Sequence, residues 1–219
     1  MIYDTLQKRR YVLEYDQTAD IPKSLIDSLL KQAWKVTPSK NNYMPYTVNV
    51  IGPEYQEYKK AVFLNCFRNQ AMGDNTTMEE IKTHRGLPRY SNILNCSYVL
   101  ILTMRLETQP NLYQQYCLDR GQVHTSTNPK TLNNGYSIAS FEAGLFLDAF
   151  GGMCLEHDID TSFTGCFQKD LESWKDVPFI KTQPIIIMTV GKGIKYRDSE
   201  QTAQFDLRPD YERIVNFIK

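Results

Sequence analysis

Three consecutive basic residues, Lys8-Arg9-Arg10, are the first group in the sequence that could do chemistry. A guanidinium presents a planar fork of N–H donors that matches the oxygens of a phosphate. The cluster therefore suits an anion clamp. The alternative is a solvated basic surface at the start of a domain, and by themselves these residues favour that second interpretation.

A second candidate is the loop at residues 37–46, TPSKNNYMPY. Ser39 and Asn42 carry a hydroxyl and an amide that can donate and accept hydrogen bonds toward the edge of a heteroaromatic ring. Pro38 and Pro45 restrict the backbone, so these groups would be held ready before a ligand arrives. Without further support, the loop is also consistent with an ordinary turn after a helix.

The third candidate is the stretch Ser162-Phe163-Thr164-Gly165-Cys166-Phe167. Because Gly165 has no side chain, backbone N–H groups at this point can approach a ligand closely. Cys166 could also be a reactive thiol, but no base stands at a fixed spacing from it. A buried, inert cysteine is the favoured alternative.

Helical and strand patterns surround these segments. Apolar residues recur at helical spacing from Ile21 to Trp34, with Asp20 as the expected N-cap. Residues 138–150 are apolar almost all round, which predicts a buried helix that ends at Gly151-Gly152. The other predicted elements are strands at 46–51, 97–103 and 184–191, a helix at 55–67 and an amphipathic C-terminal turn at 211–218.

This order of elements predicts a sheet with helices on its faces, of the α/β or α+β class. The strands at 97–103 and 184–191 are apolar on both faces, so we expect them at the centre of the sheet. Residues 105–134 are polar and show little periodicity. They predict either a cover over a site or a solvated insertion.

Composition excludes several classes of function. The 25 basic and 25 acidic residues balance, so nothing in the charge favours binding to nucleic acid or to an anionic membrane. No GxGxxG or GxxxxGK[ST] motif follows a predicted strand, and the histidines and cysteines show no metal-binding spacing. We expect no transmembrane helix and no signal peptide, and reduced cysteines in a cytoplasmic protein.

Taken in order, the three candidate segments resemble the FMN-dependent nitroreductase family. Residues 8–16 (KRRYVLEYD) are similar to the opening pattern of the family, and residues 37–46 to its loop of proline-serine, asparagine and proline-aromatic. Residues 137–147 resemble its central buried helix, and residues 159–167 its glycine-containing segment facing the flavin. The likeness spans nearly the whole chain.

The resemblance implies a single α+β domain over residues 1–219, with a central mixed sheet flanked by helices. It also implies a homodimer in which a C-terminal arm, residues 205–219, crosses to the partner. The implied activity passes electrons from NADH or NADPH through FMN to a small organic acceptor, such as a nitro compound or a quinone. No side chain is implied as a catalytic acid or nucleophile.

The resemblance also assigns residues to the cofactor. Arg9 would hold the FMN phosphate, with Arg208 as a second cation. Pro38, Ser39 and Asn42 would contact the flavin, in the family often from the partner subunit, and Gly165 and Cys166 would present N–H groups near its N5/O4 edge.

The sequence departs from the family pattern at the phosphate. Tyr11 stands where the family has a small hydroxyl residue, and Leu13 where it has a basic one. Loss of one phosphate cation costs about 1.5–3 kcal/mol, or about one to two decades in affinity, and Arg10 or Lys40 could compensate. Two alternatives stay open: a flavin enzyme of this fold that dehalogenates a metabolite or fragments the flavin, and a flavin-free ligand-binding homologue.

Overall fold

The computed structural model describes residues 8–39, 42–71, 91–105, 112–121 and 132–197, together with Val215. The predicted arm at 205–219 and the C-terminal turn at 211–218 lie outside the described residues, Val215 apart. The elements are β1 (Val12–Tyr15), α2 (Lys23–Val36), β2 (Tyr46–Ile51), α3 (Gln56–Ala71), α5 (Ser91–Asn95), β3 (Tyr98–Met104), α6 (Leu112–Leu118), α7 (Leu132–Glu156), β4 (Asp160–Thr164), η5 (Glu172–Trp174), β5 (Pro184–Gly191) and β6 (Gly193–Tyr196).

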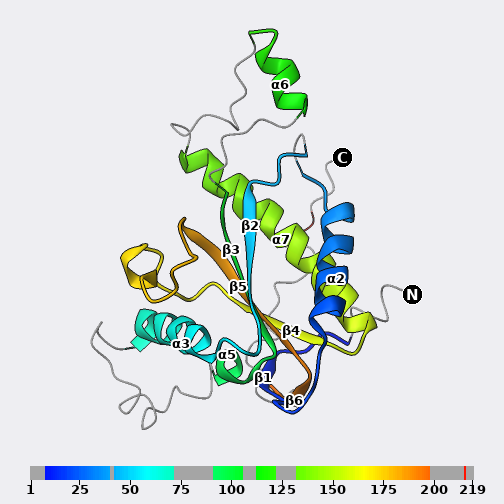
Figure 1. The fold of residues 1–219 in the computed structure, drawn as a ribbon, viewed down its shortest axis with the longest axis vertical. Coiled ribbons are helices and arrows are strands. Elements are labelled where there is room, and N and C mark those ends of the chain that lie inside the picture. The colour runs from blue at the N-terminus through cyan, green and yellow to red at the C-terminus, as the bar shows by residue number, and fades with distance from the viewer. Residues whose placement is uncertain are drawn as a thin grey trace.

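A four-stranded sheet in the order β2-β3-β5-β4 forms the centre of the molecule (Figure 1). Every residue of β3 is buried, and β3 pairs with β2 on one side and with β5 on the other. The prediction that residues 97–103 and 184–191 are central strands is therefore confirmed. The α+β class is confirmed as well, although every pairing among the described strands is antiparallel rather than mixed.

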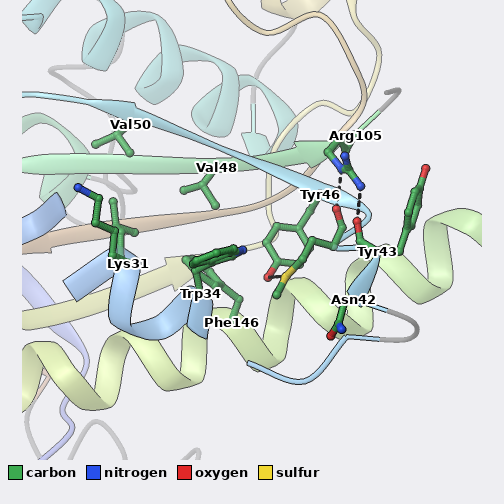
Figure 2. Close-up of a pocket in the computed structure, with 11 residues that line it drawn as sticks. Lys31, Trp34, Asn42, Tyr43, Tyr46, Val48, Val50, Arg105 and Phe146 are labelled. Atoms are coloured by element: carbon green, nitrogen blue, oxygen red, sulfur yellow. Dashed lines mark hydrogen bonds between the residues drawn. The ribbon is translucent and has the colours of Figure 1, made fainter. Parts of the chain in front are cut away.

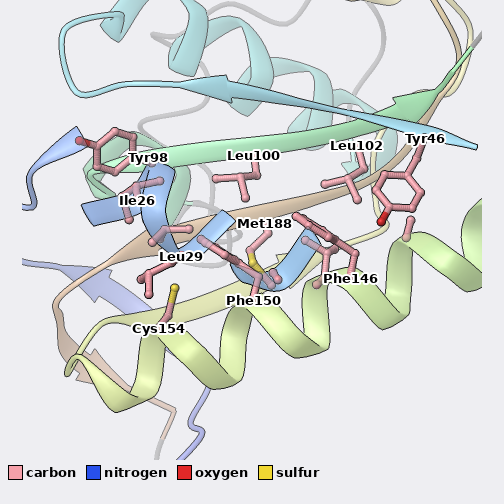
Figure 3. Close-up of a cluster of buried hydrophobic side chains, with 14 of the residues drawn as sticks. Ile26, Leu29, Tyr46, Tyr98, Leu100, Leu102, Phe146, Phe150, Cys154 and Met188 are labelled. Carbon is pink, nitrogen blue, oxygen red and sulfur yellow. The ribbon is translucent and has the colours of Figure 1, made fainter. Parts of the chain in front are cut away.

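Helices cover both faces of this sheet. Successive side chains of β3 point to opposite sides, and those on each side are apolar, so each face needs its own cover. Leu100 and Leu102 pack into a core with α2 and α7, which is shown in Figure 3. Val99 and Ile101 pack into a second core with α3, α5 and the region of η5. The strand is apolar on both faces because each face has its own layer of helices.

A separate two-stranded ribbon pairs β1 with β6, with Val12 opposite Tyr196. These two strands, of four residues each, and β4, of five, were not predicted from the sequence. Strands this short show little alternation of apolar and polar residues. The ribbon matters for the site because it places the residues just before Val12 beside those that follow Tyr196.

Helix α7 is the longest element and lies against the sheet and α2. It runs through Gly151 and Gly152 to Glu156, so the predicted stop at these glycines is wrong. A Cβ on Gly151 would lie 3.3 Å from Thr161 Oγ1, which shows that this glycine serves the close approach of the helix to β4. In the part of the chain that the structure describes, Ile138–Glu156 is the one segment long and apolar enough to cross a membrane, and half of it is buried within the fold, as expected of a core helix.

Helix α2 confirms the predicted amphipathic pattern, with two corrections. Its N-cap is Pro22, without a side-chain hydrogen bond, so Asp20 does not cap it. Trp34, assigned to the apolar face, is 58% exposed. It follows Ala33, the last buried residue of α2, and its side chain lines a surface groove instead of the core.

Candidate functional site

Helix α7 brings together two of the three segments that the sequence singled out. Arg9 Nη1 donates to Asp148 Oδ1 over 3.1 Å, and Ser39 Oγ donates to Glu142 Oε2 over 2.6 Å. Asp148 and Glu142 are six residues apart, which corresponds to about 9 Å along the helix axis. The basic cluster and the polar loop are therefore anchored to neighbouring turns of one helix.

The two acidic residues face different directions. Glu142 is 3% exposed, whereas the Asp148 side chain is 64% exposed. Six residues rotate about 600° around a helix, which leaves the two side chains about 120° apart. This geometry does not bring the two carboxylates side by side, so they do not form a paired acid/base site.

The β1–β6 ribbon holds a cluster of arginines at one end. The Arg10 guanidinium lies 3.6 Å from the centre of the Tyr196 ring, and that of Arg197 lies 4.4 Å from the Tyr11 ring. The backbone N–H of Arg197 also donates to the carbonyl of Tyr11. Tyr11, which replaces the small hydroxyl residue of the family pattern, is therefore a platform for a second arginine.

A hydrogen bond to Asp160 holds the ring of Tyr196 in place. Its hydroxyl donates to Asp160 Oδ2 over 3.0 Å, and burial, followed by this hydrogen bond, raises the pKa of Tyr196. Arg10 consequently rests on a ring that is itself anchored. Cation–π contact leaves the N–H donors at the edge of the guanidinium, so the fork can turn toward an anion.

The polar loop is held in an unusual backbone conformation. Asn42 and Met44 have φ values of 53° and 49°, in the left-handed region that residues with a Cβ rarely adopt. The Met44 N–H donates to Ser39 Oγ over 2.8 Å, and Arg105 Nε donates to the Met44 carbonyl over 2.7 Å. Arg105 Nη2 also donates to the carbonyl of Tyr43.

A largely apolar groove of about 580 Å³ opens beside this loop, between α2 and the edge strand β2 (Figure 2). Four aromatic side chains line it, so it suits a flat apolar group. Among the predicted site residues that the structure describes, Asn42 alone lines this groove. The lining residues are Leu30, Lys31, Trp34, Asn42, Tyr43, Met44, Tyr46, Val48, Val50, Arg105 and Phe146.

The third predicted segment begins in β4 and continues past its end at Thr164. Gly165 is exposed, and a Cβ placed there would meet nothing within 4 Å. The N–H of Cys166 donates to Thr164 Oγ1 over 3.1 Å, so this donor is engaged within the chain. The assignment of Gly165 and Cys166 to a flavin edge stays a prediction.

Two predicted cofactor residues, Lys40 and Arg208, lie outside the described residues. Pro38 is exposed at the start of the loop. Within the described ranges, no group of three or more His, Cys, Asp or Glu side chains could hold a metal ion.

Four residues that organise this region were not predicted as site residues: Glu142, Asp148, Arg105 and Tyr196. A signal existed only for Glu142, since a single acid in the apolar run IASFEAGLFL must find a partner if it is buried. The other three contact residues that are distant in the sequence, and pairings of that kind leave no local pattern.

Solved structures share this architecture. A protein from Staphylococcus epidermidis, provisionally named an NAD(P)H:FMN oxidoreductase, aligns over 100% of this chain and 96% of its own, with a TM-score of 0.69 and 17% identity. The chain has a nitroreductase-like fold. A provisionally named nitroreductase from Exiguobacterium sibiricum, solved with FMN, aligns over 100% of this chain and 97% of its own, with a TM-score of 0.66 and 15% identity.

A nitroreductase-like protein from Streptococcus mutans aligns over 99% of this chain and 97% of its own, with a TM-score of 0.64 and 16% identity. No protein-family model and no curated protein matches the sequence. At these identities the shared property is the nitroreductase-like fold.

Cysteine accessibility gives a first test of this candidate site. Burial raises the pKa of Cys96 and Cys154 to about 12, and it raises that of Cys66 as well, so these thiols stay protonated and unreactive near neutral pH. Cys166 is only half-buried. We expect iodoacetamide to label Cys166 first in the native protein, as read by peptide mass spectrometry.

Added FMN should slow that labelling if Cys166 borders the flavin. A Cys166→Ser variant, which removes the fastest-labelled site, is the matched control. Faster labelling of Cys154 or Cys96 would contradict the burial of these thiols.

Proposed function

We propose that this protein is an FMN-dependent oxidoreductase that passes electrons from NADH or NADPH to a small organic acceptor, such as a nitro compound or a quinone. The observation that carries the proposal is the double anchoring of Arg9 and Ser39 on neighbouring turns of α7. The FMN held by the Exiguobacterium sibiricum neighbour supports the choice of cofactor.

The arginine cluster fits a phosphate. The side chains of Arg9 and Asp148 are 49% and 64% exposed, so their ion pair contributes at most about 1 kcal/mol. A phosphate can therefore replace Asp148 as the partner of Arg9. A charge-assisted hydrogen bond from Arg9 to a phosphate contributes about 1.5–3 kcal/mol. Arg10, seated on Tyr196, is the nearby cation that offsets the missing basic residue at position 13.

The loop fits the polar edge of a flavin. A serine hydroxyl has one hydrogen and two lone pairs. Ser39 uses the hydrogen on Glu142 and one lone pair on Met44 N–H, so it can still accept a hydrogen bond from a ligand but not donate one. The exposed amide of Asn42 can do both.

Bound FMN supplies the chemistry of hydride and electron transfer. The side chains of this chain bind, orient and shield: arginines hold the phosphate, the loop orients the ring, and the groove walls exclude water. No described side chain is required as an acid or a nucleophile.

The proposed assembly is a homodimer in the cytoplasm. Arg9 and the loop lie on sides of α7 that are about 120° apart, which supports a site in which one copy offers the arginines and the other offers the loop. Residues 205–219 are the proposed crossing arm.

Colour and anaerobic reduction test the function. The purified protein, supplied with FMN and desalted, should be yellow, and NADH or NADPH should bleach it in the absence of oxygen. A yellow protein that neither nucleotide bleaches would favour a flavin enzyme with another substrate. A colourless protein that takes up no FMN would overturn the proposal in favour of a flavin-free binding protein.

A further inference from the structure

Glu142 is a buried acid that the proposed chemistry does not use. It lies in the middle of α7 with 3% of its surface exposed, and its Oε2 accepts the hydrogen of Ser39 at 2.6 Å. A buried carboxylate is unfavourable unless hydrogen bonds compensate it. The hydrogen bond from Ser39 provides such compensation and connects this acid to the loop.

The hydrogen bond to Glu142 determines how Ser39 is oriented. Because the only hydroxyl hydrogen points at Glu142, the lone pairs of Ser39 face the other way, where one of them receives the Met44 N–H over 2.8 Å. The chain Glu142–Ser39–Met44 thus connects the core helix to the backbone of the loop.

That backbone needs such a connection. Asn42 and Met44 both have positive φ, and side-chain-bearing residues keep this conformation only where surrounding contacts hold it. Arg105 holds the loop through the carbonyls of Met44 and Tyr43. Ser39, oriented by Glu142, holds it through the N–H of Met44. The carbonyl and the N–H of the Tyr43–Met44 peptide are therefore both hydrogen-bonded, the first to Arg105 and the second to Ser39.

We propose that Glu142 is a positioning residue that locks Ser39 and Met44 into the shape that receives the flavin ring. It acts through Ser39 and does not touch the cofactor. This inference rests on the proposed flavin function and extends it, since it says which core residue holds the ring-binding loop before the ligand arrives.

The position of Glu142 predicts a distinctive ligand dependence. A lock on the ring-binding loop affects every flavin equally, whereas a phosphate contact affects only FMN. Loss of the lock should therefore weaken riboflavin and FMN by the same factor. Since a charge-assisted hydrogen bond is removed, we expect a factor of roughly ten or more.

The experiment compares flavin binding by Glu142→Leu, Ser39→Ala and the double variant. Glu156→Gln, at an exposed position of the same helix, is the control. Dissociation constants for riboflavin and FMN are measured by flavin fluorescence. The expected result is the same loss for both ligands in each single variant, and no further loss in the double variant, because the two residues act in one chain. Glu156→Gln should bind as the wild type does.

Hydrogen exchange of the ligand-free protein separates this inference from the flavin proposal. The amide of Met44 should exchange faster in Glu142→Leu and in Ser39→Ala than in the wild type, whether or not the protein binds flavin. Ser39→Ala keeps the test available if Glu142→Leu does not fold, since it changes a partly buried loop residue and no residue of α7. Unchanged Met44 exchange in Ser39→Ala, or an additive loss in the double variant, would overturn the positioning role.

Discussion

Replacing Arg9 with alanine is expected to weaken FMN binding by about one to two decades while leaving riboflavin binding unchanged. The guanidinium of Arg9 is the predicted phosphate ligand, and loss of a charge-assisted hydrogen bond costs about 1.5–3 kcal/mol. Riboflavin lacks the phosphate, so its affinity does not depend on this arginine. Isothermal titration or fluorescence quenching with both ligands measures the difference.

Two variants control this result. Lys60→Ala removes a cation that pairs with Glu57 on α3, and it should bind both flavins normally. Asp148→Asn should strengthen FMN binding, because it removes a carboxylate that both pairs with Arg9 and repels the incoming phosphate. Equal retention of FMN in Arg9→Ala would remove Arg9 from the site.

The second large effect concerns the core that supports the site. Phe150 on α7 is fully buried, and its ring stacks at 6.4 Å on that of Phe146 between the helix and the sheet. Phe150→Ala removes this ring and leaves a cavity, which costs about 3–5 kcal/mol of stability. At about 2–4 °C per kcal/mol for a chain of this size, we expect Tm to fall by roughly 6–20 °C in thermal unfolding.

The exposed Phe163 on β4 provides the matched control. Its ring is 54% exposed, so Phe163→Ala should change the unfolding free energy by less than about 1 kcal/mol. Similar losses in the two variants would mean that α7 does not pack on the sheet as described.

Local patterns in the sequence determined the main elements. Residues 97–103 are apolar on both faces, which predicts a central strand, and the structure confirms it as β3 (Tyr98–Met104) with helices on both sides. The apolar residues of α2 recur at helical spacing because one face of the helix is buried, whereas residues 138–150 of α7 are apolar almost all round because most of that helix is covered. The order of these elements predicts the α/β or α+β class. The nitroreductase-like fold is implied by the resemblance of residues 8–16, 37–46, 137–147 and 159–167 to that family.

Other features depend on contacts between residues that are distant in the chain. The glycine pair at 151–152 predicts a helix end by local propensity, yet α7 continues to Glu156, and Gly151 lies at its close approach to Thr161. The β1–β6 ribbon has too few residues to show a period, and pairing alone reveals it.

The site itself divides in the same way. Arg9, Ser39 and Asn42 could be named from their residue types and order, because the chemistry they offer is a property of the side chains. The tertiary structure alone decided that Arg9 meets Asp148, that Ser39 gives its hydrogen to Glu142, and that Arg10 rests on Tyr196. These contacts join residues more than 100 positions apart, and they form only when α7 and the ribbon pack beside the sheet.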